Sequence, residues 1–198
     1  MPLHYDLDTI GFDTFGWSCI VDHGPSRIYK AADMYLAVDY HNRPSQVHFS
    51  SAEDLRSQLA GLHPHSELID VTLHTYATAT IAIAIVRTQD PPDLIYYSTV
   101  HVLFANRFWV LRLEVVDDEH HTSRETAVLS AMLASSDDLD SFAESPGLFS
   151  RFYDGMVPLE RDPVARIRRL TDRLVRSLEI PVAVLDQPRY PRRSLQTP

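Results

Sequence analysis

The stretch from Glu67 to Asp117 constrains the fold more than any other part of the chain, because it holds nearly all of the β-strand signal. Two long runs in it, Leu94 to Phe104 and Phe108 to Val116, are rich in β-branched and aromatic residues, which favour strands. The three residues between these runs, Ala105-Asn106-Arg107, fit a hairpin turn, since asparagine tolerates positive φ. The block therefore predicts an antiparallel sheet, and it carries no catalytic motif. Before the two runs, isoleucine and alanine alternate at Ile81, Ala82, Ile83, Ala84 and Ile85.

Further strands are predicted on the N-terminal side of this block. Phe15 to Val21 reads as a first strand, which ends at a turn over residues 22–25. Ile28 to Tyr40 alternates with period two and reads as one long, half-buried strand, with Ile28 and Leu36 on the same side. Ile69 to Thr75 alternates in the same way. In the last run of the block we assign one side to the core, and its members are Trp109, Leu111, Leu113 and Val115.

Three helices are predicted from their apolar stripes and their start signals. The segment Ser50–Leu62 begins with a serine and carries a glutamate three residues later, which is the spacing of a capping box. Thr122–Leu133 begins in the same way. Asp162-Pro163 starts a third helix, because an N-cap residue followed by proline is a favoured helix beginning. Its apolar residues recur every three or four positions as far as Glu179.

The bulk composition limits the class of protein and its partners. At 198 residues, with 44% hydrophobic and 23% charged residues, the chain fits a single soluble α+β domain, which we place over residues 1–185. Residues 186–198 form a Pro/Arg-rich tail, which we expect to be disordered or loosely attached. The net charge of −9 argues against a nucleic acid partner, because binding phosphates requires a concentrated basic face. We see no secretory signal and no run of the ~20 apolar residues that span a membrane, so we expect a cytoplasmic protein.

Two histidine clusters are the first candidates for a metal site. His120-His121 follows three acidic residues at 117–119, and His63 and His65 flank a proline. Imidazole and carboxylate groups together bind divalent metals. Adjacent histidines, however, point in different directions on most backbones, and no ligand-spaced motif such as H-E-x-x-H is present. We therefore expect solvated turn residues, with no metal and no cofactor.

Cys19 is the single cysteine, which excludes an internal disulfide and a multi-thiolate zinc site. It could pair with His23 as a catalytic thiolate. It lies in a predicted strand, however, and free cysteine is among the residues most often buried. No hydrolase, dinucleotide-binding or P-loop motif is present. An enzyme is therefore the less favoured class, and no catalytic residue is assigned.

Charged and aromatic residues offer three candidate binding surfaces. The acidic run Ser135–Ser145 could meet a basic partner or be a solvated loop. The aromatic residues Tyr96, Tyr97, Phe104, Phe108 and Trp109 could line a ligand pocket, although cross-strand aromatic pairs usually pack a sheet. One side of the third helix could contact an acidic protein partner or a second copy of the chain, or it could be a solvated face. Its arginines are Arg166, Arg169, Arg173 and Arg176.

The order of elements is two N-terminal strands, a helix, a run of long antiparallel strands and a closing helix. This order resembles that of the Mog1/PsbP-like α/β/α sandwich family, which includes DcrB-type and LpqN-type bacterial proteins. The residues that carry the resemblance lie between Ile28 and Ser136. They are the strand Met34–Tyr40, the helix Ser50–Leu62, the paired strands of Val100–Val115 (VHVLFANRFWVLRLEV) and the helix Thr122–Leu133. Residues 160–198 depart from the common core of the family.

The resemblance implies an antiparallel sheet flanked by helices and a non-enzymatic role, because members of the family act as assembly factors, accessory subunits or partner-binding adaptors. We therefore expect a protein-binding accessory or adaptor protein. The alternative is a small-ligand carrier with a helix-grip fold, in which the sheet and the C-terminal helix enclose a cavity. A third possibility is an enzyme with a dispersed site built on Cys19 or the histidines.

Overall fold

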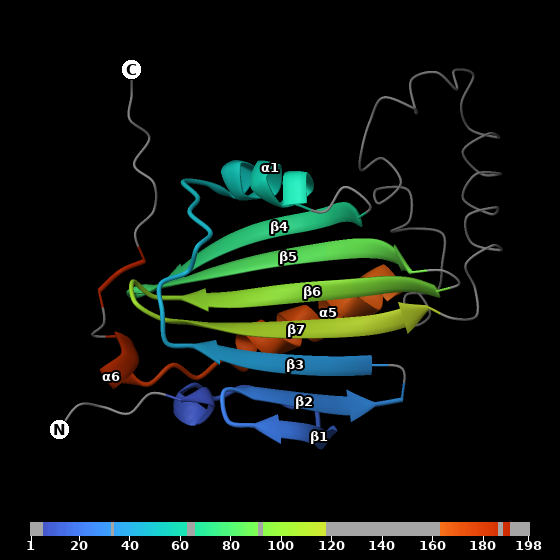
Figure 1. Cartoon of the computed structure of the whole chain (residues 1–198), viewed down its shortest axis with the longest axis horizontal. Helices are drawn as coiled ribbons and strands as arrows, with labels where there is room; N and C mark the ends of the chain where they lie inside the picture. The colour runs from blue at the N-terminus through green and yellow to red at the C-terminus, as the bar shows by residue number, and fades with distance from the viewer. Residues whose placement is uncertain are drawn as a thin grey trace.

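The computed structural model describes residues 6–32, 34–62, 66–90, 93–117, 163–185 and 188–190. In these ranges the chain forms a seven-stranded sheet in which every neighbouring pair of strands is antiparallel (Figure 1). The strands lie in the order β1-β2-β3-β7-β6-β5-β4. The predicted α+β class with an antiparallel sheet is confirmed. The bounds are Ser18–His23 (β1), Ser26–Ala31 (β2), Met34–His41 (β3), Ser66–Tyr76 (β4), Ala79–Asp90 (β5), Asp93–Leu103 (β6) and Phe108–Asp117 (β7).

Several predictions fall outside the described residues. These are the helix over Thr122–Leu133, the acidic run Ser135–Ser145 and both histidine clusters, at 63–65 and 120–121. The described residues nevertheless contain the sheet block apart from residues 91–92, and the helix that begins at Pro163.

β6 and β7 form the hairpin that the sequence predicts. This hairpin joins the two halves of the sheet. Phe104 N donates to Arg107 O at 3.0 Å across the turn. The side of β7 that the sequence assigns to the core is buried, because Trp109, Leu111 and Leu113 are 0% exposed. β7 also pairs with β3, so this hairpin connects the β1–β3 half to the β4–β6 half.

The segment Ile28–Tyr40 is two strands joined by a two-residue turn, so the prediction of one long strand is wrong. Ala32, in that turn, has a positive φ of 52°. Pairing of β2 with β3 places Tyr29 opposite Leu36. Ile28 therefore points to the other face, away from Leu36. A two-residue turn reverses the phase of the alternation, but here the reversal is hidden because Ile28 and Tyr29, on opposite faces, are both apolar.

Described helices lie on both faces of the sheet (Figure 1). α5 (Pro163–Arg176) lies across β6 and β7 and buries Ile167 and Leu174 in the main core. α1 (Ala52–Leu62) lies on the other face, where Leu55 joins a second cluster. Both helices are confirmed, although α5 ends before the predicted Glu179. Among the described helices, none is long and apolar enough to cross a bilayer.

The start of α1 differs from the prediction by one residue. Ser51 Oγ accepts a hydrogen bond from Asp54 N at 3.1 Å, which is the N-cap contact. The Asp54 carboxylate in turn accepts from Ser50 N at 2.8 Å. Ser51 and Asp54 thus carry the capping contacts that the sequence assigned to Ser50 and Glu53, because aspartate also accepts from the backbone at this position.

The N-terminal segment holds the end of α5 against the sheet. Gly11 and Glu179 exchange backbone hydrogen bonds of 2.8 and 2.9 Å. Asp13 N donates to Ser177 Oγ at 2.8 Å. The Asp13 carboxylate accepts from Arg173 Nε at 2.6 Å. Three kinds of contact therefore join residues 11–13 to the C-terminal end of α5.

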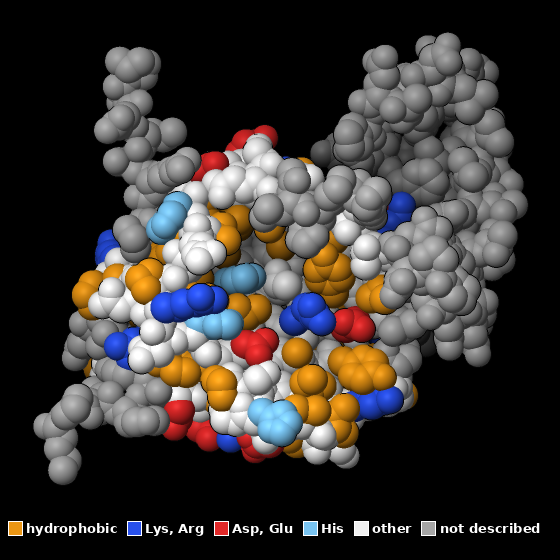
Figure 2. Space-filling view, viewed as in Figure 1, with side chains coloured by type: hydrophobic (Ala, Val, Ile, Leu, Met, Phe, Trp, Pro, Cys, Tyr) orange, Lys and Arg blue, Asp and Glu red, His pale blue; other side chains and the backbone are white. Residues whose placement is uncertain are grey.

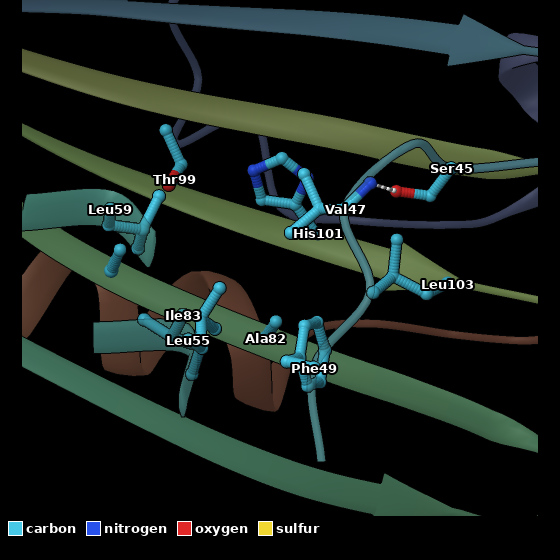
Figure 3. A pocket seen from close by; sticks show the side chains of 11 residues that line it. Ser45, Val47, Phe49, Leu55, Leu59, Ala82, Ile83, Thr99, His101 and Leu103 are labelled. Atoms are coloured by element: carbon cyan, nitrogen blue, oxygen red, sulfur yellow. Dashed lines mark hydrogen bonds between the residues drawn. The ribbon is translucent and has the colours of Figure 1, made fainter. Parts of the chain in front are cut away.

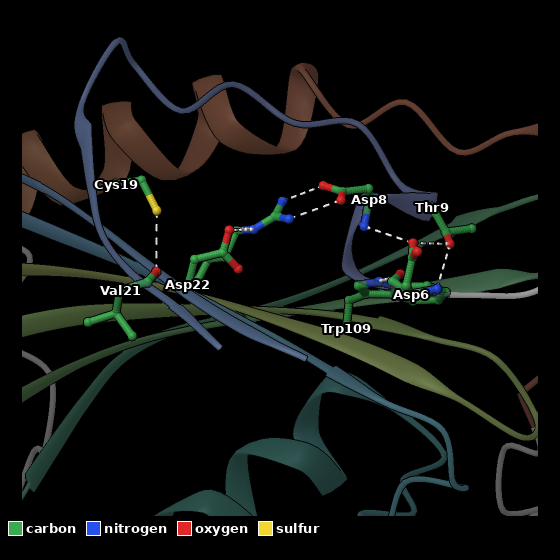
Figure 4. A network of polar contacts seen from close by, with 8 residues as sticks. Asp6, Asp8, Thr9, Cys19, Val21, Asp22 and Trp109 are labelled. Atoms are coloured by element: carbon green, nitrogen blue, oxygen red, sulfur yellow. Dashed lines mark hydrogen bonds and ion pairs between the residues drawn. The ribbon is translucent and has the colours of Figure 1, made fainter. Parts of the chain in front are cut away.

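A 3-10 helix, η1 (Leu7–Thr9), brings a polar network to the edge of the main core (Figure 4). Trp109 Nε1 donates to Asp6 O at 3.1 Å, so the buried indole has a partner. Arg27 of β2 forms an ion pair with Asp8. The hydrogen bond from Arg27 lowers the pKa of Asp8. The network thus ties η1 to both β2 and β7.

Part of the predicted tail packs against the domain. After α6 (Val182–Leu185) the chain passes to the α1 face, where Pro188 O accepts from Ala105 N at 3.2 Å. Tyr190 is 4% exposed, and its ring centroid lies 5.5 Å from that of Phe49. The expectation of a loosely attached tail is therefore wrong for Tyr190, since an aromatic side chain among prolines and arginines is here a core residue.

Replacing Trp109 tests the link between η1 and the core. We expect Trp109→Phe to lower the free energy of unfolding by about 1–2 kcal/mol, because the hydrogen bond from the indole to Asp6 O is lost. Trp109→Ala should cost about 3–5 kcal/mol. Urea denaturation measures both. Ile20→Ser is the control, since Ile20 is 52% exposed on β1 and should change stability by less than about 0.5 kcal/mol. A Trp109→Phe protein as stable as the wild type would contradict this role.

Candidate functional site

β5 gives the two faces of the sheet different shapes. Ile81 and Ile85 lie on the α5 face and are buried in the main core. Ala82 and Ala84 lie on the α1 face and belong to the second cluster. Because their side chains are single methyl groups, the floor beneath α1 is lower than a row of larger residues would make it. The alternation in β5 therefore places bulky side chains in the core on the α5 face and leaves a hollow beneath α1.

The hollow lies between α1 and the sheet and has a volume of about 50 Å³ (Figure 3). Leu55 and Leu59 of α1 form one wall, and Val47 and Phe49 of the preceding segment form another. Apolar side chains make up most of the lining, so the few polar side chains in it are candidates for recognition. The remaining lining residues are Ser45, Ala82, Ile83, Ala84, Thr99, His101 and Leu103.

Thr99 and His101 are the polar side chains on the floor of the hollow. They pair across to Ala84 and Ala82, which places both on the α1 face. Within the described part of the chain, neither side chain makes a hydrogen bond. Burial lowers the pKa of His101 to about 4, and the charge of nearby His41 contributes. At neutral pH His101 is therefore an uncharged imidazole with one donor and one acceptor.

Beyond the hollow, the α1 face is open over β7 and β3. Among the described helices, α1 is the one on this face, and it lies toward the β4 end of the sheet (Figure 1). Figure 2 shows apolar, charged and histidine side chains mixed over this surface. Val110 pairs with His101, so the surface continues directly from the floor of the hollow. We call this surface the open face; its residues are Tyr35, Ala37, Asp39, Val110, Arg112 and Glu114.

Charges on the open face are partly engaged within the sheet. Arg112, whose side chain is 54% exposed, lies 3.5 Å from Glu114. Asp39 accepts a hydrogen bond of 2.5 Å from Ser26 Oγ. The other open-face residues are half-buried. The open face thus combines the apolar side chains of Tyr35, Ala37 and Val110 with three charged ones, of which Arg112 and Glu114 lie within ion-pair distance of each other.

A second recess lies on the α5 face, between α5 and β4 and β5. Its volume is about 200 Å³. It is more polar than the hollow and carries both signs of charge. This is the place where the carrier alternative predicts a cavity. The lining residues are Asp70, Thr72, His74, Ile83, Ile85, Arg168, Thr171, Asp172 and Val175.

The arginines predicted to bind a partner lie on α5, opposite its buried stripe. Arg173 is paired with Asp13 at 2.6 Å and lies 5.0 Å from the ring centroid of Phe15. Arg176 is paired with Asp172 at 2.8 Å. Arg173 and Arg176 thus hold partners within the described part of the chain. The four are Arg166, which is half-buried, and Arg169, Arg173 and Arg176, which are exposed.

The aromatic residues of the sheet block serve packing. Tyr96, Phe104 and Trp109 are buried, and Phe104 and Trp109 meet edge to face with ring centroids 6.0 Å apart. Tyr97 and Phe108 are half-buried on the α1 face. Neither recess is lined by any of the five. The packing interpretation therefore explains these residues better than a ligand pocket does.

Cys19 is exposed, so the expectation of a buried strand cysteine is wrong. β1 is the edge strand, and its register with β2 shifts between Cys19 and Val21. The thiol donates to Val21 O at 3.3 Å. Cys19 and His23 lie at opposite ends of β1, so the structure does not bring them together. Within the ranges described, no three His, Cys, Asp or Glu residues are grouped as a metal would require.

The sequence analysis missed the hollow and its two polar residues. One local signal exists, because His101 interrupts the apolar run Val100–Leu103. The small size of Ala82 and Ala84 is visible in the sequence as well. What the sequence does not show is that α1 packs above these alanines and that His101 is their neighbour.

Comparison of the chain with models of protein families and with curated proteins gives no match. The resemblance to the Mog1/PsbP-like family accordingly stays a prediction from the order of elements. The geometry of the hollow and of the open face carries the functional argument.

Acidification should destabilise the protein through His101. The unfolded chain takes up this proton near pH 6.5, whereas the folded protein takes it up near pH 4. The free energy of unfolding should therefore fall by about 2–3 kcal/mol as the pH drops through this window, and level off below it. Urea denaturation at several pH values, compared with His101→Leu, isolates this contribution. Identical pH dependence of the two proteins would show that His101 is not responsible.

Tyr190 should stabilise the wall of the hollow, because its hydroxyl donates to Val47 O. We expect Tyr190→Phe to cost about 1 kcal/mol and Tyr190→Ala about 3–4 kcal/mol. Amide hydrogen exchange of residues 45–49 should speed up in the alanine variant. Arg189→Ala, at the exposed neighbouring position, is the control and should leave exchange unchanged. Unaltered exchange of residues 45–49 in Tyr190→Ala would show that Tyr190 does not stabilise the wall of the hollow.

Proposed function

We propose that the protein is a non-enzymatic accessory or adaptor protein that binds a protein partner on the open face. The observation that carries this proposal is the surface over β3 and β7, which no described helix covers, beside the hollow in which Thr99 and His101 make no hydrogen bond among the described residues. Tyr35 and Arg112 on this surface are of residue types that are enriched in protein interfaces.

Size and chemistry favour this class over an enzyme. The hollow, at about 50 Å³, is far smaller than the ~300–1,000 Å³ of typical small-molecule sites. His101 lies among apolar side chains, with the hydroxyls of Ser45 and Thr99 as the other polar groups of the lining. In the described part of the chain it has no carboxylate hydrogen-bonded to it that would orient it as a general base.

The sandwich arrangement is part of the same proposal. α1 on one face and α5 on the other give the layering of the Mog1/PsbP-like family, whose members bind protein partners. From this likeness we expect self-association or a protein partner. The net charge of −9 argues against a nucleic acid partner. We keep the cytoplasm as the proposed compartment.

A small-ligand carrier is the second candidate, and the recess beside α5 favours it. This recess has about 200 Å³ and lies between the sheet and the C-terminal helix, where a helix-grip carrier holds its ligand. Its lining, with Asp70, Asp172 and Arg168, would suit a small zwitterionic molecule. A small molecule that stays bound to the purified protein, located by its protection of α5 amides, would favour this candidate.

The arginines of α5 form a possible second contact surface for an acidic partner or a second copy of the chain. Arg169 is the residue to test, because its side chain is exposed and because replacing Arg173 would also break the contact with Asp13. Arg169→Glu should weaken capture of an acidic partner while leaving the Asp13 contact intact. Unchanged capture and unchanged native mass would remove α5 from the proposal.

Partner capture by variants of the open face tests the main proposal. The immobilised protein is incubated with extract of its native cells, and captured proteins are identified by mass spectrometry. The wild type should retain a stoichiometric partner. Ala37→Arg or Arg112→Glu should weaken capture of this partner at least about tenfold, because each variant turns an unpaired charge toward it.

The matched control is Ile20→Arg, which places the same charge at an exposed site on edge strand β1. It should capture the partner as the wild type does. Thermal midpoints confirm that all variants are folded. Equal capture by Ala37→Arg, Arg112→Glu and wild type would overturn the open face as the binding surface.

A further inference from the structure

The hollow has the size of one small aliphatic side chain. A water-sized group needs about 10–15 Å³ measured in the same way, so about 50 Å³ holds roughly four such groups. A leucine side chain has four carbon atoms. A benzene ring, by contrast, occupies an engineered cavity of about 150 Å³. The hollow therefore fits an aliphatic group and excludes an aromatic one.

The occupant must also offer polar groups beside its apolar part. Thr99 and His101 point into the hollow and have no hydrogen bond within the described residues. A neutral imidazole and a hydroxyl each offer one donor and at least one acceptor. A peptide group presents the matching N–H and C=O. A purely apolar occupant would leave both side chains unsatisfied, at a cost in affinity.

The hollow opens toward a larger surface. Its lining stops at β6, and the next residue across the sheet from His101 is Val110 of the open face. An occupant of about four carbon atoms cannot itself cover the open face. It must belong to a larger molecule that lies over β7 and β3. The buried anchor residue of a protein interface belongs to its partner protein in the same way.

We infer that the hollow is an anchor pocket for one leucine-sized aliphatic side chain of a protein partner, and that Thr99 and His101 bind the main-chain peptide groups beside it. This inference rests on the proposed function, since it names what the partner inserts at the open face. His101 is then a recognition residue, and Ala82 and Ala84 set the depth of the pocket.

The first test uses a blocked amino acid as the probe. N-acetyl-leucine-N′-methylamide, which carries one aliphatic side chain between two peptide groups, is titrated into ¹⁵N- and methyl-labelled protein. Signals of Leu55, Leu59, Ala84, Thr99 and His101 should shift saturably. The matching alanine compound should produce no saturable shift. Isobutanol, which has the branched chain but no peptide group, should bind roughly fivefold more weakly, because it makes fewer hydrogen bonds.

Three variants separate the pocket from the surface around it. Ala84→Leu fills the floor and should abolish binding of the leucine probe. Leu59→Phe narrows the pocket from the α1 side and should also abolish binding of the leucine probe. It replaces Ala84→Leu in the test if that variant does not fold. His101→Leu should keep the fold and weaken the probe roughly fivefold. Arg112→Glu, outside the lining, should leave probe binding unchanged.

The outcomes distinguish this inference from the proposed function. If the leucine probe gives no saturable shift while open-face variants still abolish partner capture, the anchor pocket is wrong and the binding face stands. If isobutanol binds as tightly as the leucine probe, the hollow is a small-molecule pocket and the inference fails. If the leucine probe binds and Ala84→Leu also weakens partner capture, both are supported.

Discussion

The alternation of isoleucine and alanine in β5 is the constraint on which the functional geometry depends. A strand turns successive side chains to opposite faces, so one segment decides how both faces are filled. Ile81 and Ile85 join the core on the α5 face, and Ala82 and Ala84 leave space beneath α1. Neither face can be altered by shifting the register, because a shift of one residue would exchange isoleucine and alanine between the faces. The core and the hollow are therefore specified together.

α5 shows how a charged helix can be mostly structural. Its apolar stripe lies on the sheet, and its arginine side faces outward. Arg173, however, binds Asp13 and covers Phe15, which fixes the N-terminal segment over the end of the helix. Such a contact uses the length of the arginine side chain as much as its charge. The local concentration of arginine is thus partly explained by the closure of the domain.

The sequence predicted the elements that follow strict local rules and missed those set by distant contacts. The core side of β7 was recognised because alternation over a long run has one solution. The turn at Ala32 was missed because Ile28 and Tyr29 are both apolar, which hides the reversed phase of the alternation in β2. Tyr190 was placed in a loose tail because its neighbours are prolines and arginines, and nothing local indicates Phe49 as its partner. The hollow depends on which alanines α1 covers, which is a tertiary fact with no local pattern.

The contact between the N-terminal segment and the end of α5 has a consequence for how the protein is made. Asp13 and Ser177 are 164 residues apart in the sequence, yet they lie side by side. During synthesis, β3, β6 and β7 leave the ribosome long before the helix that covers them. Until this helix is synthesised, the apolar side of the sheet, with Trp109 and Leu111, remains in contact with solvent, with a chaperone or with itself. A short translational pause before residue 163 would prolong this exposed state, and the yield of native protein would fall with it.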